Sequence, residues 1–388
     1  MQRKWEAIQQ NLMKRKDEAL FRENKEAVSS QKPERVVNGK EVLSFNSNDY
    51  LGLAGDVRLR EAMTKAALKY GVGSGASHLL GGHTDEHTAL EEELADFLER
   101  DRVLLFSTGY MANLGIIQAM VGRKGDVFAD RLNHASLVDA GVLARAKVHR
   151  YYHSDMQNLQ QKLEQYDKGA SFVVSDGVFS MDGDVANVSQ LVAFAKNYEA
   201  WLMIDDAHGL GVLGETGGGT LEQVSLSQED VPILMGTFGK AFGTFGAFVA
   251  GKTALIEYIQ QYARSSIYTT AMPAALVAAT RVSLDIVKKE HWRREKLQWL
   301  IESFRTGAAE RGISLMVSNT PIQPVSVGSN QAAIEVSAEL WEKGVYVSPI
   351  RPPTVPEGTA RLRVALSALH EESHIEQLLE CLERSVVK

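Results

Sequence analysis

The chain has 388 residues, of which 44% are hydrophobic and 23% charged, with a formal net charge of −7 at pH 7. These values are ordinary for a globular protein with room for two domains, and the negative charge argues against general nucleic-acid binding. One cysteine excludes an intrachain disulfide. The polar N-terminus does not resemble a secretion signal, and no apolar run approaches the ~20 residues of a membrane span. We therefore expect a cytoplasmic protein.

In chain order, three parts are predicted. Residues 1–45 should form an amphipathic helix, a linker and a hairpin that turns at Asn38-Gly39. Over residues 46–288, strand and helix patterns alternate, which predicts an α/β domain with a large, mostly parallel sheet covered on both faces. Residues 289–388 should form a smaller C-terminal α+β domain. The strands expected in the large sheet are 102–106, 126–129, 147–151, 172–176, 201–205, 233–236 and 246–250.

Lys240 lies within Gly-Thr-Phe-Gly-Lys-Ala-Phe-Gly, residues 236–243. Glycines let the backbone approach a ligand closely. A partly desolvated amine loses its proton readily and can attack a carbonyl to form a Schiff base. A surface turn with an ordinary lysine explains this octapeptide equally well when it is taken alone.

A second motif favours the Schiff-base interpretation. The apolar strand 201–204 leads into Asp205-Asp206-Ala207-His208-Gly209. Open α/β sheets place their ligands at the carboxyl ends of such strands. Pyridoxal phosphate (PLP) needs a carboxylate that keeps its pyridine nitrogen protonated, and Asp205 is the natural candidate, with His208 close enough to reach the phenolic oxygen. A metal site would need further ligands at suitable spacing, which the sequence does not offer, so we expect no metal.

These motifs resemble those of the α-oxoamine synthases, which are PLP-dependent acyltransferases of fold type I. The resemblance covers nearly the whole chain, and its combination of blocks in this order is specific to the family. The further blocks that carry it are residues 47–53, 73–77, 106–113, 130–136 and 177–184.

The resemblance implies a cofactor site in which Lys240 holds PLP, Asp205 and His208 contact its ring, and His134 stacks on the ring beside the substrate. The segment 107–113 follows a strand and opens a helix, and amides at such a helix start bind anions. The cofactor residues expected in addition are Gly109, Tyr110, Ser180, Thr237 and Thr270. Because Thr270 matches a position that reaches the phosphate of the neighbouring subunit, the resemblance also implies a homodimer with shared active sites.

Substrate contacts follow from the same matches. A bidentate arginine suits an amino-acid carboxylate, and Arg363 matches the family arginine, with Asn48 as a possible assistant. By strand alternation Arg361 shares its face, so either arginine, or Arg351, fits this role by sequence. Arg22 and Thr354 resemble positions that contact substrate or product.

The activity that the resemblance implies is decarboxylative condensation of an amino acid with an acyl thioester. Residues 350–356 and the chain length favour L-alanine and a pimeloyl thioester, carried on CoA or on an acyl-carrier protein. Glycine with acetyl-CoA or succinyl-CoA, or serine with palmitoyl-CoA, stays open. A PLP-binding protein that has lost catalysis would be expected to lack the lysine or the aspartate, and both are present.

Overall fold

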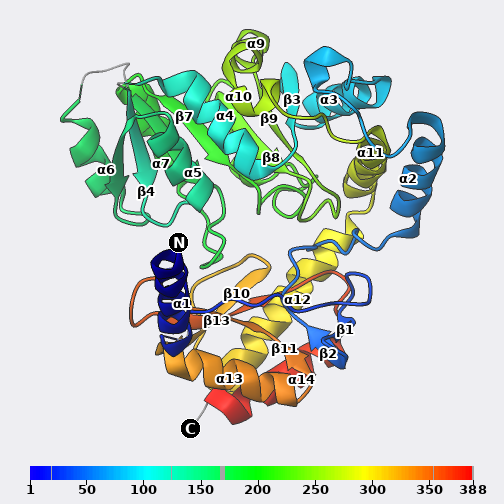
Figure 1. Cartoon of the computed structure of the whole chain (residues 1–388), viewed down its shortest axis with the longest axis vertical. Coiled ribbons are helices and arrows are strands. Elements are labelled where there is room, and N and C mark those ends of the chain that lie inside the picture. Colours follow the sequence, from blue (N-terminus) through cyan, green and yellow to red (C-terminus); the bar gives the residue numbers. More distant parts are fainter. Residues whose placement is uncertain (19, 124, 167–170, 353, 387–388) are drawn as a thin grey trace.

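The protein is described by a computed structural model that covers residues 1–18, 20–123, 125–166, 171–352 and 354–386 (Figure 1). Its largest sheet has seven strands in the order β3-β9-β8-β7-β6-β4-β5. β9 is antiparallel to β3 and β8, and the other neighbours are parallel. The strands are β3 (Arg102–Phe106), β4 (Asp126–Asp130), β5 (Lys147–Tyr151), β6 (Ser171–Asp176), β7 (Trp201–Asp205), β8 (Ile233–Thr237) and β9 (Ala247–Gly251). The predicted α/β class and mostly parallel sheet are confirmed.

Helices cover both faces of this sheet, which explains why its central strands are apolar without alternation. Every residue of β6 and β9 is buried. The helices are α1 (Gln2–Asp17), α2 (Val57–Tyr70), α3 (Asp85–Phe97), α4 (Gly109–Val121), α5 (Ala135–Leu143), α6 (Met156–Leu163), α7 (Val188–Asn197), α8 (Thr220–Gln223), α9 (Thr253–Tyr262), α10 (Arg264–Ile267), α11 (Ala274–Lys289), α12 (Trp292–Glu310), α13 (Asn330–Glu342) and α14 (Glu372–Val386), with a 3-10 turn η1 (His78–Leu80).

Among the residues that the structure describes, two three-stranded sheets accompany the large one, in the orders β1-β2-β11 and β10-β13-β12. The N-terminal hairpin turns at Asn38 and Gly39, whose φ angles are 48° and 75°, as a two-residue hairpin turn requires. Its second strand pairs in parallel with β11, so the chain's two ends share a sheet. The domain boundaries expected near residues 45 and 288 stay predictions. The strands are β1 (Glu34–Val37), β2 (Lys40–Ser44), β10 (Ile322–Gly328), β11 (Val345–Tyr346), β12 (Ser348–Ile350) and β13 (Ala360–Ala365).

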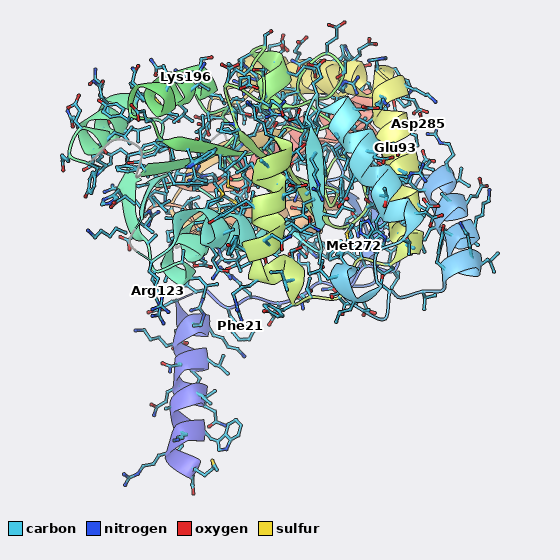
Figure 2. All side chains as sticks on the ribbon, turned by 90° about the horizontal axis from the view of Figure 1, so that it is seen from above. Phe21, Glu93, Arg123, Lys196, Met272 and Asp285 are labelled. Atoms are coloured by element: carbon cyan, nitrogen blue, oxygen red, sulfur yellow. The ribbon has the colours of Figure 1, made fainter. Side chains whose placement is uncertain are left out.

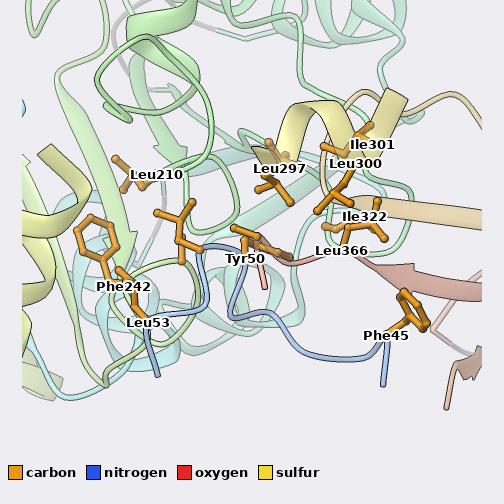
Figure 3. Packing of buried hydrophobic residues seen from close by; sticks show 14 of the residues in the cluster. Phe45, Tyr50, Leu53, Leu210, Phe242, Leu297, Leu300, Ile301, Ile322 and Leu366 are labelled. Carbon is orange, nitrogen blue, oxygen red and sulfur yellow. The ribbon is translucent and has the colours of Figure 1, made fainter. Parts of the chain in front are cut away.

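One buried apolar cluster runs between the large sheet and the C-terminal elements (Figure 3). Phe242 and Leu210 lie at one end, and Ile322 lies at the other. In the same view (Figure 3) Leu53 lies beside Phe242, Tyr50 lies in the middle and Phe45 lies toward the Ile322 end, and none of the three is exposed. The segment 45–53 is therefore held rigidly where the parts of the molecule meet.

Helix α1 stands away from the rest of the chain (Figure 2). The sequence predicted an amphipathic helix here, but no residue of α1 is buried. Its apolar side chains Trp5, Ile8 and Leu12 are 61%, 48% and 46% exposed. Within the described ranges, none of the helices combines the length and apolarity that crossing a membrane would require.

Candidate active site

The candidate site lies at the carboxyl ends of three adjacent parallel strands. Asp176 ends β6 and pairs in register with Asp205 at the end of β7. Asp205 pairs in turn with Met235 of β8, which leads into Lys240. Because parallel strands end at one edge of a sheet, these side chains converge where α/β sheets bind ligands.

Asp205 is buried, with 4% of the residue exposed. Its Oδ2 accepts a hydrogen bond of 2.7 Å from Asn113 Nδ2, and its Oδ1 accepts one of 3.1 Å from the Ala207 amide. The neighbouring Asp176 accepts a 2.7 Å bond from the His134 amide. Burial, reinforced by the charge of Asp205, raises the pKa of Asp176 well above its ordinary value. The neutral form of Asp176 is therefore favoured in this site.

Hydrogen bonds fix the tautomer of His134, which caps helix α5. Its Nδ1 lies 2.7 Å from Ser136 Oγ and accepts a 3.3 Å bond from the Ser136 amide. Nδ1 is therefore an acceptor, and a neutral ring carries its proton on Nε2. Partial burial lowers the pKa of His134. The charge of Asp205 opposes this shift, and the charge of Lys240 adds to it. Asn113 also donates to Ser136 Oγ over 2.8 Å, so a hydrogen-bonded chain joins His134 to Asp205.

Lys240 is half-buried. Burial, assisted by the charge of Arg363, lowers its pKa to about 8 against the opposing charges of Asp205 and Asp176. The lysine lines a cavity of about 440 Å³ together with Asn48 and Lys25. An amine with this pKa is partly unprotonated near neutral pH, as a Schiff-base lysine must be.

His208 and Arg363 are joined through Tyr50. The Tyr50 hydroxyl lies 2.7 Å from His208 Nδ1 and 3.1 Å from Asn48 Oδ1. Arg363 Nη2 donates to Asn48 Oδ1 over 3.0 Å and to Tyr50 Oη over 3.4 Å, and its Nε donates to the Ser180 carbonyl over 2.7 Å. Burial, then the charges of Lys240 and Arg363, lowers the pKa of His208 well below its ordinary value. His208 is therefore a neutral ring.

The structure separates the two arginines that alternation left equivalent. Arg361 forms an ion pair with Asp182, and its guanidinium also donates to the carbonyl and hydroxyl of Thr359 over 2.9 and 3.0 Å. Arg363 is the one that reaches Asn48 and Tyr50. Of the two, only Arg363 shares a hydrogen-bonded network with His208.

The expected phosphate cradle lies beside β8. Helix α4 begins at Gly109, and the first amides of a helix have no partner within it. A Cβ at Gly109 would lie 3.2 Å from Met235 Cε and 3.8 Å from Thr237 Cβ, so the helix start and the strand end are in close contact. The side chain of Tyr110 is exposed and its hydroxyl bonds to Asp139. Thr270 is also exposed, and its carbonyl accepts a 3.4 Å bond from Ser107.

Arg22 and Thr354 lie outside this cluster, in a second cavity of about 1010 Å³. This second cavity adjoins the Arg363 network. Its lining includes Met181, which follows Ser180 in the sequence, and Ser348, which pairs in register with Arg363. Its walls are partly apolar. Among the described residues around it, one is acidic (Glu23) and five are cationic, namely Arg15, Lys16, Arg22, Lys25 and Arg351.

His153, Asp182 and Asp184 lie close enough together to hold a cation. Each already has a protein partner: His153 contacts Asp130 at 3.0 Å and Asp184 at 2.9 Å, and Asp182 pairs with Arg361. Burial disfavours the charged His153 ring, but Asp130 and Asp184 outweigh the effect of burial and raise the pKa of His153 to about 9. A protonated ring is not a metal ligand, so this cluster is an ion-pair network.

Sequence reasoning missed four members of the site: Tyr50, Asn113, Ser136 and Asp176. Asp176 had a usable signal, because it ends a buried strand as Asp205 does. The others lay inside the motif blocks, but their roles depend on contacts with residues far away in the chain, which no spacing reveals.

Comparison with known proteins identifies the family. The sequence profile of the family "Aminotransferase class I and II" matches residues 40–382. The chain is 54% identical to an 8-amino-7-oxononanoate synthase of Saccharophagus degradans over 97% of this chain and 95% of that protein. It is likewise 54% identical to the enzyme of that name from Thioalkalivibrio sulfidiphilus, over 98% and 97%. The protein therefore belongs to the class I and II aminotransferase family, among the 8-amino-7-oxononanoate synthases.

Solved structures agree with this assignment. Serine palmitoyltransferase from S. paucimobilis, with bound PLP, superposes with a TM-score of 0.92 at 29% identity, covering 98% of this chain and 97% of that one. An 8-amino-7-oxononanoate synthase from Francisella tularensis superposes with a TM-score of 0.77 at 34% identity, over 89% and 98%. The chain is thus a PLP-dependent transferase of fold type I, as predicted.

The residues present fit PLP. A lysine with a lowered pKa, a buried carboxylate at a strand end and a helix start crowded against Thr237 supply partners for its aldehyde, ring nitrogen and phosphate. Asn113 Oδ1 is buried without a hydrogen-bond partner among the described residues. Such an unsatisfied polar atom beside Asp205 is typical of a site built for a ligand.

Proposed function

We propose that the protein condenses L-alanine with a pimeloyl thioester to give 8-amino-7-oxononanoate, CO2 and the free carrier thiol, a step of biotin synthesis. The α-carbon of alanine forms a bond to the acyl carbon, the C–S bond breaks, and the alanine carboxylate leaves as CO2. The observation that carries the proposal is the 54% identity, over nearly the whole chain, to relatives with this name.

Several residues would hold the cofactor. We assign Lys240 to the covalent link with PLP, Asp205 to the ring nitrogen and His208 to the phenolic oxygen, with His134 over the ring and Ser180 beside it. The phosphate is assigned to Gly109, Tyr110 and Thr237. When bound, PLP supplies an electron sink that stabilises negative charge at the α-carbon.

The chain's own groups account for the proton steps. Lys240, with a pKa of about 8, can accept the α-proton of alanine near neutral pH. Arg363, supported by Asn48, is placed to bind the alanine carboxylate. The Nε2 proton of His134 is available to the thioester carbonyl oxygen, where negative charge develops as the carbon–carbon bond forms.

The larger cavity suits the acyl chain. Apolar side chains such as Met181 and Ile350 accompany Arg22, Arg351 and Thr354 in its lining. Such a mixture complements a pimeloyl group, which ends in a carboxylate. An unsubstituted acetyl or palmitoyl chain carries no carboxylate that such a lining could recognise. CoA and an acyl-carrier protein both remain compatible as the thiol carrier.

A homodimer in the cytoplasm is part of the proposal. Beside Thr270, the chain exposes the apolar residues Val72, Leu80 and Tyr268 at 87%, 82% and 72%. The two segments that carry them are joined by hydrogen bonds such as Ala271 N to Ala76 O at 2.9 Å. Apolar patches of this kind are typical of protein interfaces, and a second copy here would bring Thr270 near the partner's phosphate site.

The decisive experiment supplies the PLP-loaded protein with pimeloyl-CoA and with L-alanine, glycine or L-serine in turn. We expect thiol release with alanine alone and 8-amino-7-oxononanoate by mass spectrometry. Thiol release with glycine or serine instead would keep the family and overturn the proposed substrate. Lys240→Ala should abolish turnover, and full activity of that variant would refute the assigned mechanism.

A further inference from the structure

Residues 20–28 form a strap that carries Arg22 from helix α1 to the N-terminal hairpin. Its far end is fixed by the Val28 amide donating to Val36 over 3.1 Å and by Asn38, whose amide donates to the Glu26 carbonyl over 2.7 Å. Its near end is fixed where the Leu20 amide donates to the Arg15 carbonyl over 2.7 Å. Arg22 lies between these anchors, so its position depends on what holds the middle of the strap.

Lys25 occupies an aromatic box in the middle of the strap. Its Nζ lies 3.8 Å from the ring centroid of Trp341 and 4.4 Å from that of Tyr346. The two rings are 5.2 Å apart and nearly perpendicular, at 84°. They belong to α13 and β11, and the Tyr346 carbonyl accepts bonds from the Phe45 amide and Asn46 Nδ2. The two rings are therefore held in place by the fold, and they bind the ammonium of a side chain that is itself exposed at the surface.

Lys25 also lies between the two cavities of the site. Lys25 lines the cavity that reaches Lys240, and it also lines the cavity that contains Arg22 and Thr354. In the sequence it is three residues from Arg22. Burial lowers the pKa of Lys25, so its ammonium is partly desolvated there. A charge in this place acts on the position of the strap, and through it on the position of Arg22.

We infer that Lys25 is a positioning residue for the acyl substrate. By binding between Trp341 and Tyr346, Lys25 holds the strap so that Arg22 faces the terminal carboxylate of the thioester. The inference rests on the proposed function, because it needs a substrate with that carboxylate. Removing the ammonium should weaken recognition of the acyl end and leave the chemistry at Lys240 unchanged.

Lys25→Met keeps the length of the side chain and removes its charge. We expect the KM for pimeloyl-CoA to rise about tenfold, with kcat and the KM for alanine unchanged. Pimelate binding to the PLP-loaded protein, measured by calorimetry, should weaken to a similar degree. Lys25→Arg should restore both quantities, because a guanidinium also fits an aromatic box. Lys4→Met, on the exposed helix α1, is the matched control and should match the wild type.

Two results would overturn the inference: unchanged pimelate binding in Lys25→Met, or an equal change in the alanine KM. Lys25→Met combined with Arg22→Ala should bind pimelate no more weakly than Arg22→Ala alone, since both act on one contact, and full additivity would also refute it. If Lys25→Met fails to fold, Trp341→Leu provides the same comparison. A wild-type protein that neither binds pimelate nor uses pimeloyl-CoA would instead refute the proposed function.

Discussion

Asp206, the second acid of the Asp-Asp-Ala-His motif, leads to a quantitative prediction about stability. Its carboxyl is not exposed, and Oδ2 accepts a 2.7 Å bond from the Thr220 amide. Glycines surround it: a Cβ at Gly209 would lie 2.1 Å from Oδ1, and one at Gly219 would lie 2.0 Å from Oδ2. Burial raises its pKa from an ordinary 3.8 to about 7.

For an acid whose pKa is raised by folding, the charged form costs stability. The cost is absent below pH 3.8, grows as the pH rises toward 7, and is constant above that. At ~1.4 kcal/mol per pKa unit, the cost is about 2 kcal/mol at pH 5 and about 4 kcal/mol at pH 8. Asn is neutral and can still accept the Thr220 amide. The free energy of unfolding of Asp206→Asn, relative to that of the wild type, should therefore be about 2–3 kcal/mol higher at pH 8 than at pH 5.

The assay is urea unfolding at pH 5 and pH 8, at one protein concentration with saturating PLP. Asp230→Asn is the matched control. Hydrogen bonds from Lys196 and Ser227 lower the Asp230 pKa to about 2. Because Asp230 is ionised at both pH values, the difference in free energy of unfolding between Asp230→Asn and the wild type should be the same at pH 5 and pH 8. If the Asp206→Asn difference is also the same at both, or is smaller at pH 8, the electrostatic argument is wrong.

Two further substitutions test the hydrogen-bonded network. Ser136→Ala removes the hydroxyl that orients His134, and we expect kcat to fall about tenfold with an unchanged KM for alanine in steady-state assays; an unchanged kcat would contradict the orienting role of this hydroxyl. Arg363→Ala removes the proposed carboxylate partner and should raise the alanine KM about a hundredfold. Thr359→Ala removes the hydroxyl that accepts from Arg361 and donates to the Pro356 carbonyl, and it removes no hydrogen bond of Arg363. It should leave the alanine KM unchanged, and the reverse pattern would assign the carboxylate to Arg361.

Much of the fold was readable because its signals are local. The seven strands of the large sheet fell within one or two residues of prediction, since strands buried on both faces are continuous apolar runs. Asn38-Gly39 marked its turn because few residues adopt the required φ angles. Helix α1 shows the limit: its apolar spacing predicted an amphipathic helix, but burial of the apolar face depends on a partner surface, and none of its residues is buried in this chain.

The sequence by itself determined the chemistry-bearing motifs, Asp205 after its strand and Lys240 among glycines, since each depends on neighbours a few residues away. Tertiary structure alone decided which arginine joins His208, because Arg361 and Arg363 occupy equivalent strand positions and differ only in what they face. It also decided that Arg22 and Thr354 line one cavity. Contacts between distant segments follow from packing of the whole chain, which no local spacing encodes.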